Sequence, residues 1–140
     1  MKTKIKIFHL EDDNEWIDIV KSALDGYEVY SARTLQEAIT LYGAQKFDAA
    51  ILDISLMPGD SKDQQGERFL NALKGLDVLP GKRIIILSAY LMGLSNQDRV
   101  RKYFRFYDVK DAIPKQKFDS KEFREVMDEI VESPIASDAK

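Results

Sequence analysis

The stretch FDAAILD, residues 47–53, is a continuous apolar run that ends in an acid. Runs without polar alternation are typical of strands that a parallel sheet buries on both faces. A carboxylate placed directly after such a run is costly unless a partner compensates its charge. The stretch therefore predicts a central strand of an α/β fold, with Asp53 held beside a partner at its end.

Short apolar runs alternate with segments of helical periodicity on both sides of this stretch. Further strands are predicted over 4–10, 27–31, 82–89 and within 108–115. Helices are predicted over 14–24, 34–45, 95–107 and 119–132, and around Phe69, Leu70, Leu73 and Leu76. Such β-α units predict one parallel sheet with helices on both faces, reached by right-handed crossovers.

Three of these helices carry apolar faces that the spacing defines. The face of the first consists of Trp16, Ile17, Val20, Ala23 and Leu24. The face of the second consists of Leu35, Ala38, Ile39 and Tyr42, and that of the last of Phe123, Val126, Met127, Ile130 and Val131. Thr34, with Glu37 three residues later, has the form of a capping box and places the start of the second helix.

Composition narrows the class of protein. The 140 residues fit one domain, and the absence of cysteine excludes disulfides and thiolate chemistry. A content of 44% hydrophobic and 32% charged residues is typical of a soluble globular protein. No apolar run could span a bilayer and no signal peptide is visible, so no membrane partner and a cytoplasmic location are expected. The net charge of −3 argues against nucleic acid as a partner of the domain.

The chain is expected to divide near residue 132. A single domain over 1–132 contains every predicted strand and helix. The polar stretch 133–140 is interpreted as a flexible tail or the start of a linker.

Reactive side chains stand where four of the predicted strands end. They are Glu11, Asp12, Asp53, Ser88 and Lys115. Because the functional crevice of such sheets lies outside the carboxyl ends of the strands, these side chains are expected at one edge. Carboxylates suit Mg²⁺, an ion that also holds phosphate oxygens, and one acid placed as a nucleophile can form an aspartyl phosphate. A lysine neutralises charge on the transferring group, and a hydroxyl that is engaged only by that group makes a switch.

Four segments in this order carry a resemblance to a known family. They are HLEDD (9–13), ILDISLMP (51–58), IIILSA (84–89) and IPK (113–115). With them the chain resembles the receiver domain of two-component response regulators over about residues 4 to 132. The resemblance implies a flavodoxin-like, doubly wound (βα)5 fold whose five parallel strands have the order 2-1-3-4-5. It also implies Mg²⁺ as the cofactor.

The resemblance assigns a role to each site residue. Asp53 is the phosphoacceptor, and Ser88 and Lys115 stand at the family's hydroxyl and lysine positions. The metal ligands are Glu11, Asp12, Asp53 and the backbone carbonyl of Ser55. Within the acidic pair, Asp12 is expected to be the direct ligand.

The implied function is a phosphoacceptor of a phosphorelay rather than an enzyme. Asp53 would accept a phosphoryl group from the phosphohistidine of a histidine kinase or phosphotransfer protein. Phosphorylation would change a surface formed by helix four, strand five and helix five for partner binding. The alternative is a pseudo-receiver, an interaction module that is never phosphorylated. The kinase, the output partner and a homodimer are left open.

Several positions depart from the family pattern. The loop 57–66 is longer than usual, and Pro58 stands one position later than expected after Asp53. Ala112 occupies the place where the family commonly has a tyrosine or phenylalanine ring. The helix 95–107 interleaves basic and aromatic residues, and it is interpreted either as a packed helix or as a partner-binding surface.

Three residues near or among the acids are interpreted as structural rather than as part of the site chemistry. Asp13 is expected to cap the first helix, as Asn14 also could. His9 is expected to be a packed, hydrogen-bonded histidine within a strand. Trp16 is assigned to core packing rather than to a cofactor platform.

A flavin site is disfavoured, because carboxylates after the first strand would repel the phosphate of the flavin nucleotide.

Overall fold

The structure, a computed structural model, describes residues 5–53, 83–88 and 109–132. The strands are β1 (Lys6–Leu10), β2 (Glu28–Ala32), β3 (Ala49–Leu52), β4 (Ile84–Ser88) and β5 (Val109–Pro114). The helices are α1 (Asn14–Ala23), α2 (Leu35–Ala44), α5 (Ser120–Glu132) and a short 3-10 turn, η1 (Lys115–Lys117). The predicted loop 57–66, the helix around Phe69 to Leu76, the helix 95–107 and the tail 133–140 lie outside the described residues.

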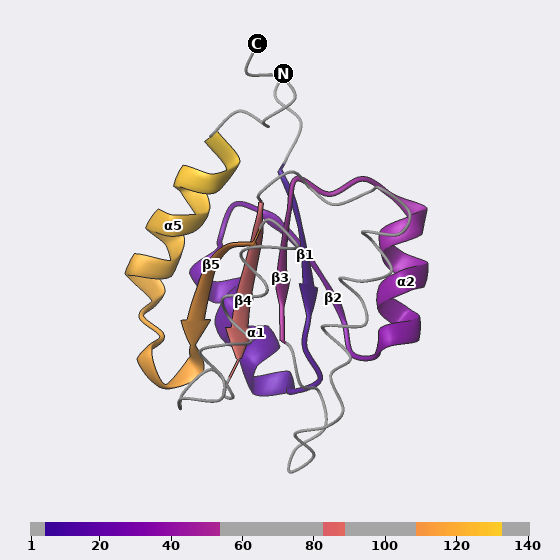
Figure 1. Cartoon of the computed structure of the whole chain (residues 1–140), viewed down its shortest axis with the longest axis horizontal. Coiled ribbons are helices and arrows are strands. Elements are labelled where there is room, and N and C mark those ends of the chain that lie inside the picture. Colours follow the sequence, from indigo (N-terminus) through magenta and orange to yellow (C-terminus); the bar gives the residue numbers. More distant parts are fainter. Residues whose placement is uncertain (1–4, 54–82, 89–108, 133–140) are drawn as a thin grey trace.

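The five strands form one parallel sheet in the order β2-β1-β3-β4-β5 (Figure 1), so the predicted fold class and strand order are confirmed. In the register of the sheet, Leu10 lies beside Leu52, and Leu52 beside Ile86. The residues that follow Leu10 and Leu52 are Glu11 and Asp53. The register therefore brings these two acids to neighbouring positions at one edge.

A β-bulge interrupts the pairing of β4 with β5. Ile84 pairs with Val109, but Ile85 pairs with Asp111, so Lys110 has no partner in the ladder. Beyond the bulge the pairing is regular as far as Ser88 and Pro114. A bulge adds one residue to one strand and increases its local twist. Here the bulge determines that Pro114 lies beside Ser88. It therefore also determines that Lys115, the next residue, lies at the edge of the sheet.

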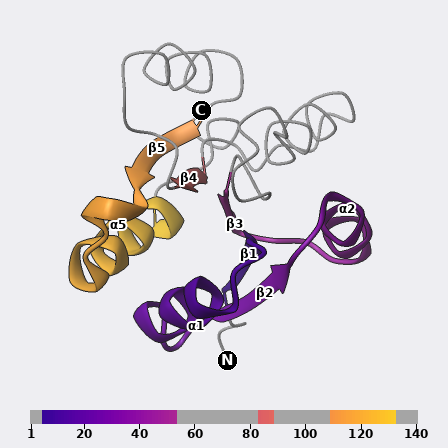
Figure 2. The same ribbon diagram turned by 90° about the horizontal axis from the view of Figure 1, so that it is seen from below.

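Helices cover both faces of the sheet. Figure 2 shows α1 and α5 together on one side of the strands and α2 on the other. Successive side chains of a strand point to opposite faces, so Ile7 and Ile51 pack toward α1 and α5, while Phe8 and Leu52 pack toward α2. Every residue of β3 is buried, as expected for a central strand covered on both sides. None of the described helices is long and apolar enough to cross a membrane.

The predicted apolar faces of α1 and α5 are confirmed. Ile17, Val20 and Leu24 are buried on α1 or at its end, with Trp16 and Ala23 half-buried beside them. On α5 the buried residues are Phe123, Met127 and Ile130, with Val126 and Val131 packed against them. These two helices therefore share one hydrophobic core with the strands.

The predicted face of α2 is wrong at one residue. Ile39 is 47% exposed, whereas Ala38 is fully buried. Leu41 packs against the core together with Leu35 and Tyr42. A helix turns by about 100° per residue, so a face centred on Ala38 and Leu41 leaves Ile39 on its solvent side. Both faces satisfy helical spacing, and packing against β1 and β2 selects one of them.

Side-chain caps begin both N-terminal helices, as predicted. The Asp13 carboxylate accepts a hydrogen bond from the Glu15 amide at 2.9 Å, and the Thr34 hydroxyl accepts one from the Glu37 amide at 3.1 Å. The Glu37 carboxylate in turn accepts a hydrogen bond from the Arg33 amide at 3.0 Å. The residues before α2 and the first turn of α2 are therefore joined by hydrogen bonds from both sides. Each contact satisfies an amide that lacks a partner within the helix.

Replacing Thr34 by alanine should lower the free energy of unfolding by about 1 kcal/mol, because it removes the cap of α2. Urea denaturation would measure the change. Thr40→Ala is the matched control: it is the same substitution in the same helix at an exposed position, and it should change stability by less than about 0.5 kcal/mol. Equal stabilities of the two variants would show that the cap contributes nothing.

Candidate functional site

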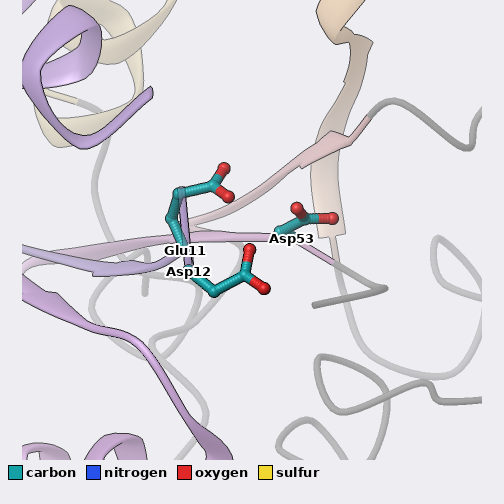
Figure 3. A group of neighbouring side chains, drawn as sticks. All are labelled: Glu11, Asp12 and Asp53. Atoms are coloured by element: carbon teal, nitrogen blue, oxygen red, sulfur yellow. The ribbon is translucent and has the colours of Figure 1, made fainter. Parts of the chain in front are cut away.

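The edge of the sheet at the carboxyl ends of β1 and β3 gathers the three predicted acids. Figure 3 shows the side chains of Glu11, Asp12 and Asp53 directed into one small region beyond these strands. The backbone fixes two of them, because the Glu11 amide donates to the Ala32 carbonyl at 2.9 Å and the Asp53 amide to the Leu10 carbonyl at 3.0 Å. The parallel sheet itself therefore holds the acids together.

The three carboxylates lie close enough to share one ion. One oxygen of each lies within 4.8 Å of the others. Glu11 is 1% exposed and Asp53 is 4% exposed, while Asp12 is half-buried. Buried carboxylates at this separation repel one another, and the repulsion needs a cation to offset it.

Lys115 supplies positive charge to this cluster. It follows β5 and begins η1, and its Nζ lies 2.6 Å from Glu11 Oε1 and 3.2 Å from Asp53 Oδ2. Its side chain is 10% exposed, so both ion pairs are largely shielded from water. The lysine thus bridges two acids that come from different strands.

The second oxygen of Glu11 is also engaged. Glu11 Oε2 accepts a hydrogen bond from the Asp13 amide at 3.2 Å, while Oε1 forms the ion pair with Lys115. Asp12, in contrast, forms no ion pair with any residue that the structure describes. The consecutive acids therefore have different surroundings. Both oxygens of Glu11 are engaged by the protein, Asp12 is half-buried without an ion pair to a described residue, and Asp13 caps α1.

The electrostatics follow from burial and from the excess of acids. Burial, and then the charge of Asp53, raise the pKa of Glu11 to about 7, although Lys115 opposes the shift. The same two causes raise the pKa of Asp12. Burial alone would lower the pKa of Lys115, but the charge of Asp53 and the contact with Glu11 outweigh it and raise that pKa. One lysine does not balance three carboxylates, so a further cation would be favourable here.

The raised pKa of Glu11 predicts a pH dependence of stability. Its folded-state pKa of about 7 lies above the ordinary 4.5, so the metal-free protein should lose stability as pH rises from about 4.5 through about 7. Glu11→Gln carries no charge to bury and should be more stable than wild type at pH 8, by on the order of 1–3 kcal/mol. The difference should shrink at pH 4.5.

Urea denaturation in a chelating buffer at several pH values would measure this difference. Glu15→Gln is the matched control, because Glu15 is exposed in the first turn of α1. It should leave the wild-type pH profile unchanged. A Glu11→Gln protein that is less stable than wild type at pH 8 would show that the pair with Lys115 outweighs the cost of burying the charge.

Ser88 lies at the same edge. It ends β4, is fully buried and lies beside Pro114 in the sheet register, one residue before Lys115. Ala112 lies beside Ile86 and packs, half-buried, against the core on the α2 side. The predicted fourth metal contact, the carbonyl of Ser55, lies outside the described residues. Of the predicted site residues, Glu11, Asp12, Asp53, Ser88 and Lys115 are thus placed at one edge.

His9 lies beneath the site on β1. It is 1% exposed, which confirms that it is packed, but its Nδ1 has no hydrogen-bond partner among the described residues. The predicted hydrogen bond is therefore not found at this atom. Burial, followed by the charges of Lys115 and Lys21, lowers the pKa of His9 to about 3. The ring is accordingly neutral at physiological pH, and its buried position does not suit it to donate a phosphoryl group.

Trp16 has a contact that the sequence did not reveal. It packs against the core shared by α1 and α5, as predicted, but its ring also faces the Lys115 ammonium at 5.1 Å from the ring centroid. The sequence signal was weak, because the two residues lie on different elements and only the register of β5 brings them together.

The fold and the site together define a class of protein: a parallel α/β domain with a cluster of three carboxylates at the carboxyl edge of its sheet. Solved structures of response regulator receiver domains share this fold over more than nine-tenths of the chain. The predicted resemblance to receiver domains is thereby confirmed at the level of the fold.

Three of these structures illustrate the similarity. The non-phosphorylated HemR receiver domain from Leptospira biflexa is 29% identical, with a TM-score of 0.72, over 94% of this chain and 97% of its own. A CheY-like receiver domain protein from Methanospirillum hungatei JF-1 is 24% identical, with a TM-score of 0.74, over 93% and 95%. A response regulator from Thermotoga maritima is 22% identical, with a TM-score of 0.73, over 94% and 100%. No protein-family model and no curated protein sequence matches the chain.

Proposed function

We propose that the protein is a phosphoacceptor receiver in which Asp53 accepts a phosphoryl group. The observation that carries this proposal is the position of Asp53. It is 4% exposed, has an ammonium 3.2 Å from one oxygen, and shares a small region with two further carboxylates. Formation of an aspartyl phosphate is favoured by a cation that offsets the charge of the incoming group and by carboxylates that hold a metal, and here Lys115 and the two further acids would supply these.

The residues present fit Mg²⁺. Three hard oxygen donors lie within 4.8 Å of one another, and their charge exceeds that of Lys115. Asp12 and Asp53 would bind the ion directly, together with the carbonyl of Ser55. Glu11 would act through water, because Lys115 and the Asp13 amide already engage its two oxygens. Bound Mg²⁺ would offset the negative charge of the carboxylates and of the phosphoryl oxygens.

The transfer is a displacement at phosphorus. An oxygen of Asp53 attacks the phosphorus of a phosphohistidine on a histidine kinase or phosphotransfer protein. The new P–O bond forms as the P–N bond breaks, and the imidazole leaves with the electron pair of that bond. Lys115 is placed to neutralise charge on the phosphoryl oxygens, since its Nζ already lies beside Asp53.

Phosphorylation would change partner affinity from this edge. Ser88, buried at the end of β4, is assigned the hydroxyl that binds the phosphoryl oxygens. The responding surface would include β5 and α5, together with the helix predicted over 95–107, which lies outside the described residues. The proposal includes a histidine kinase or phosphotransfer protein as the partner that donates the phosphoryl group. It also includes a cytoplasmic location. Nucleic acid is disfavoured as a partner of the domain itself, because the net charge of the chain is −3.

One observation favours the alternative, a pseudo-receiver that is never phosphorylated. Ala112 lies half-buried beside Ile86, where receivers commonly have an aromatic ring that follows the hydroxyl. With alanine at this position, the protein would lack the aromatic ring that commonly moves with the hydroxyl residue on phosphorylation. The complete set of acids, hydroxyl and lysine supports phosphorylation instead, because a module without that chemistry has no reason to hold three carboxylates together at a cost.

Intact mass spectrometry distinguishes the two functions. The protein is incubated with acetyl phosphate and Mg²⁺, and a parallel sample contains a chelator. A receiver should gain one phosphoryl group only where Mg²⁺ is present, and the group should be lost in base. No mass gain under either condition, from acetyl phosphate or other small phosphodonors, would favour the pseudo-receiver.

A further inference from the structure

Trp16 lies against the ammonium of the site. It is in the first turn of α1, three residues after the cap Asp13, and is half-buried. Its ring centroid lies 5.1 Å from Lys115 Nζ. The same nitrogen contacts Glu11 and Asp53 through its two ion pairs. The lysine end group therefore has two carboxylates and one aromatic ring as neighbours.

Other rings hold the Trp16 ring in place. Phe118 meets it edge-to-face, with centroids 5.2 Å apart and planes at 90°. Phe118 also contacts Phe123 at 5.1 Å, and Phe123 is 1% exposed within the core of α5. The second pair is tilted, with planes at 48°, whereas the edge-to-face pair of Trp16 with Phe118 has a favourable and directional geometry. The ring beside the ammonium is thus fixed by a row of packed aromatics that ends in the core.

A fixed ring matters because a lysine end group is otherwise poorly confined. The side chain rotates about several bonds, and its ammonium is compact and strongly hydrated. Ion pairs on one side orient it, but water on the other side would allow it to move. An aromatic face attracts a cation without donating or accepting a competing hydrogen bond, and the attraction strengthens when water is excluded. At 10% exposure, Lys115 meets that condition.

We propose that Trp16 is a positioning residue, whose ring face holds the Lys115 ammonium between Glu11 and Asp53 for phosphoryl transfer. The inference rests on the proposed function, since it assigns Trp16 a part in the reaction at Asp53. It goes beyond core packing, because a packing role requires only the volume of the ring, whereas positioning requires its electron-rich face.

The contact can be tested without any reaction. In the ¹H–¹³C spectrum of protein labelled at lysine, the ε-methylene protons beside a ring face should be shifted upfield. Lys115→Arg identifies this signal by removing it. Trp16→Leu should return it to the position of an exposed lysine, and Trp16→Phe should leave part of the shift. An unshifted Lys115 signal in the wild type would overturn the inference.

The effect on the reaction is tested by fluorination. Trp16 is the only tryptophan in the chain, so fluorinated tryptophan supplied during expression replaces this ring alone. Fluorine withdraws charge from the ring face and changes its shape little. The rate of Asp53 labelling by acetyl phosphate should fall stepwise with one and several fluorines, and by about fivefold in Trp16→Leu. Thermal unfolding of the fluorinated proteins should stay close to that of wild type.

A matched control is Tyr30→Leu. Tyr30 is also a half-buried ring with a lysine above it, Lys6 at 5.9 Å, but it packs against Phe47 on the other face of the sheet. Its removal should leave the rate of Asp53 labelling unchanged. A comparable slowing in Tyr30→Leu would show that loss of any such ring lowers the rate through stability, and the inference would fail.

The outcomes separate this inference from the proposed function. If wild type takes up no phosphoryl group while the Lys115 signal is shifted, the proposed function fails. The role of Trp16 in phosphoryl transfer then fails as well, although its contact with Lys115 stands. If wild type is labelled and the fluorinated proteins are labelled at the same rate, the positioning role alone fails. Trp16→Leu is not needed for this decision, because the fluorinated chains keep the native ring.

Discussion

An Asp53→Asn protein should take up no phosphoryl group from acetyl phosphate and Mg²⁺, whereas wild type should gain one. The amide cannot act as the nucleophile that forms an acyl phosphate, and it carries no charge for the metal. The variant should nevertheless fold, because its backbone hydrogen bond to Leu10 remains and the repulsion from Glu11 is removed. Intact mass spectrometry measures the uptake, and unfolding in urea confirms that the variant is native.

The matched control for this experiment is Asp48→Asn. Asp48 precedes β3, at the opposite end of the strand from Asp53, and its carboxylate accepts a hydrogen bond from the Lys6 amide at 2.9 Å. An asparagine oxygen can accept the same bond, so this variant should be labelled like wild type. Equal labelling of Asp53→Asn would place the phosphoryl group on another residue, and Asp12 would be the first to test.

Asp12→Ala should weaken Mg²⁺ binding by at least about a hundredfold, and Glu11→Ala by only about tenfold. The structure gives the reason for this split. Lys115 and the Asp13 amide hold both oxygens of Glu11, while Asp12 is half-buried and forms no ion pair with a described residue. Loss of a direct ligand removes a metal–oxygen bond, whereas loss of an outer group removes only its support.

Trp16 fluorescence would follow the titration, because the ring lies beside the lysine that shares the acids. Asp13→Ala is the control: it removes the third consecutive acid, which caps α1 and contributes no oxygen to the cluster. Its Mg²⁺ affinity should stay within about twofold of wild type, since an exposed charge at this range is screened by salt. Indistinguishable affinities for Asp12→Ala and Glu11→Ala would contradict the assigned roles.

Much of the fold was predictable because its signals are local. Periodicity distinguishes strands from helices, and a continuous apolar run such as 49–52 identifies a strand buried on both faces. The capping roles of Asp13 and Thr34 are equally local, since each side chain contacts an amide two or three residues away. Ile39 was mispredicted for the opposite reason. Helical spacing allows two adjacent faces on α2, and only the neighbouring strands select between them.

That the acids, the hydroxyl and the lysine lie together was predictable from the order of residues along the chain, because parallel strands end at one edge and each of these residues ends or follows a strand. The contacts among these side chains at that edge were not predictable in this way. Lys115 bridges Glu11 and Asp53, the latter 62 positions away in the chain, and lies under the Trp16 ring. Such contacts depend on strand register, on the bulge in β5 and on side-chain rotamers, which are settled by packing across the whole domain.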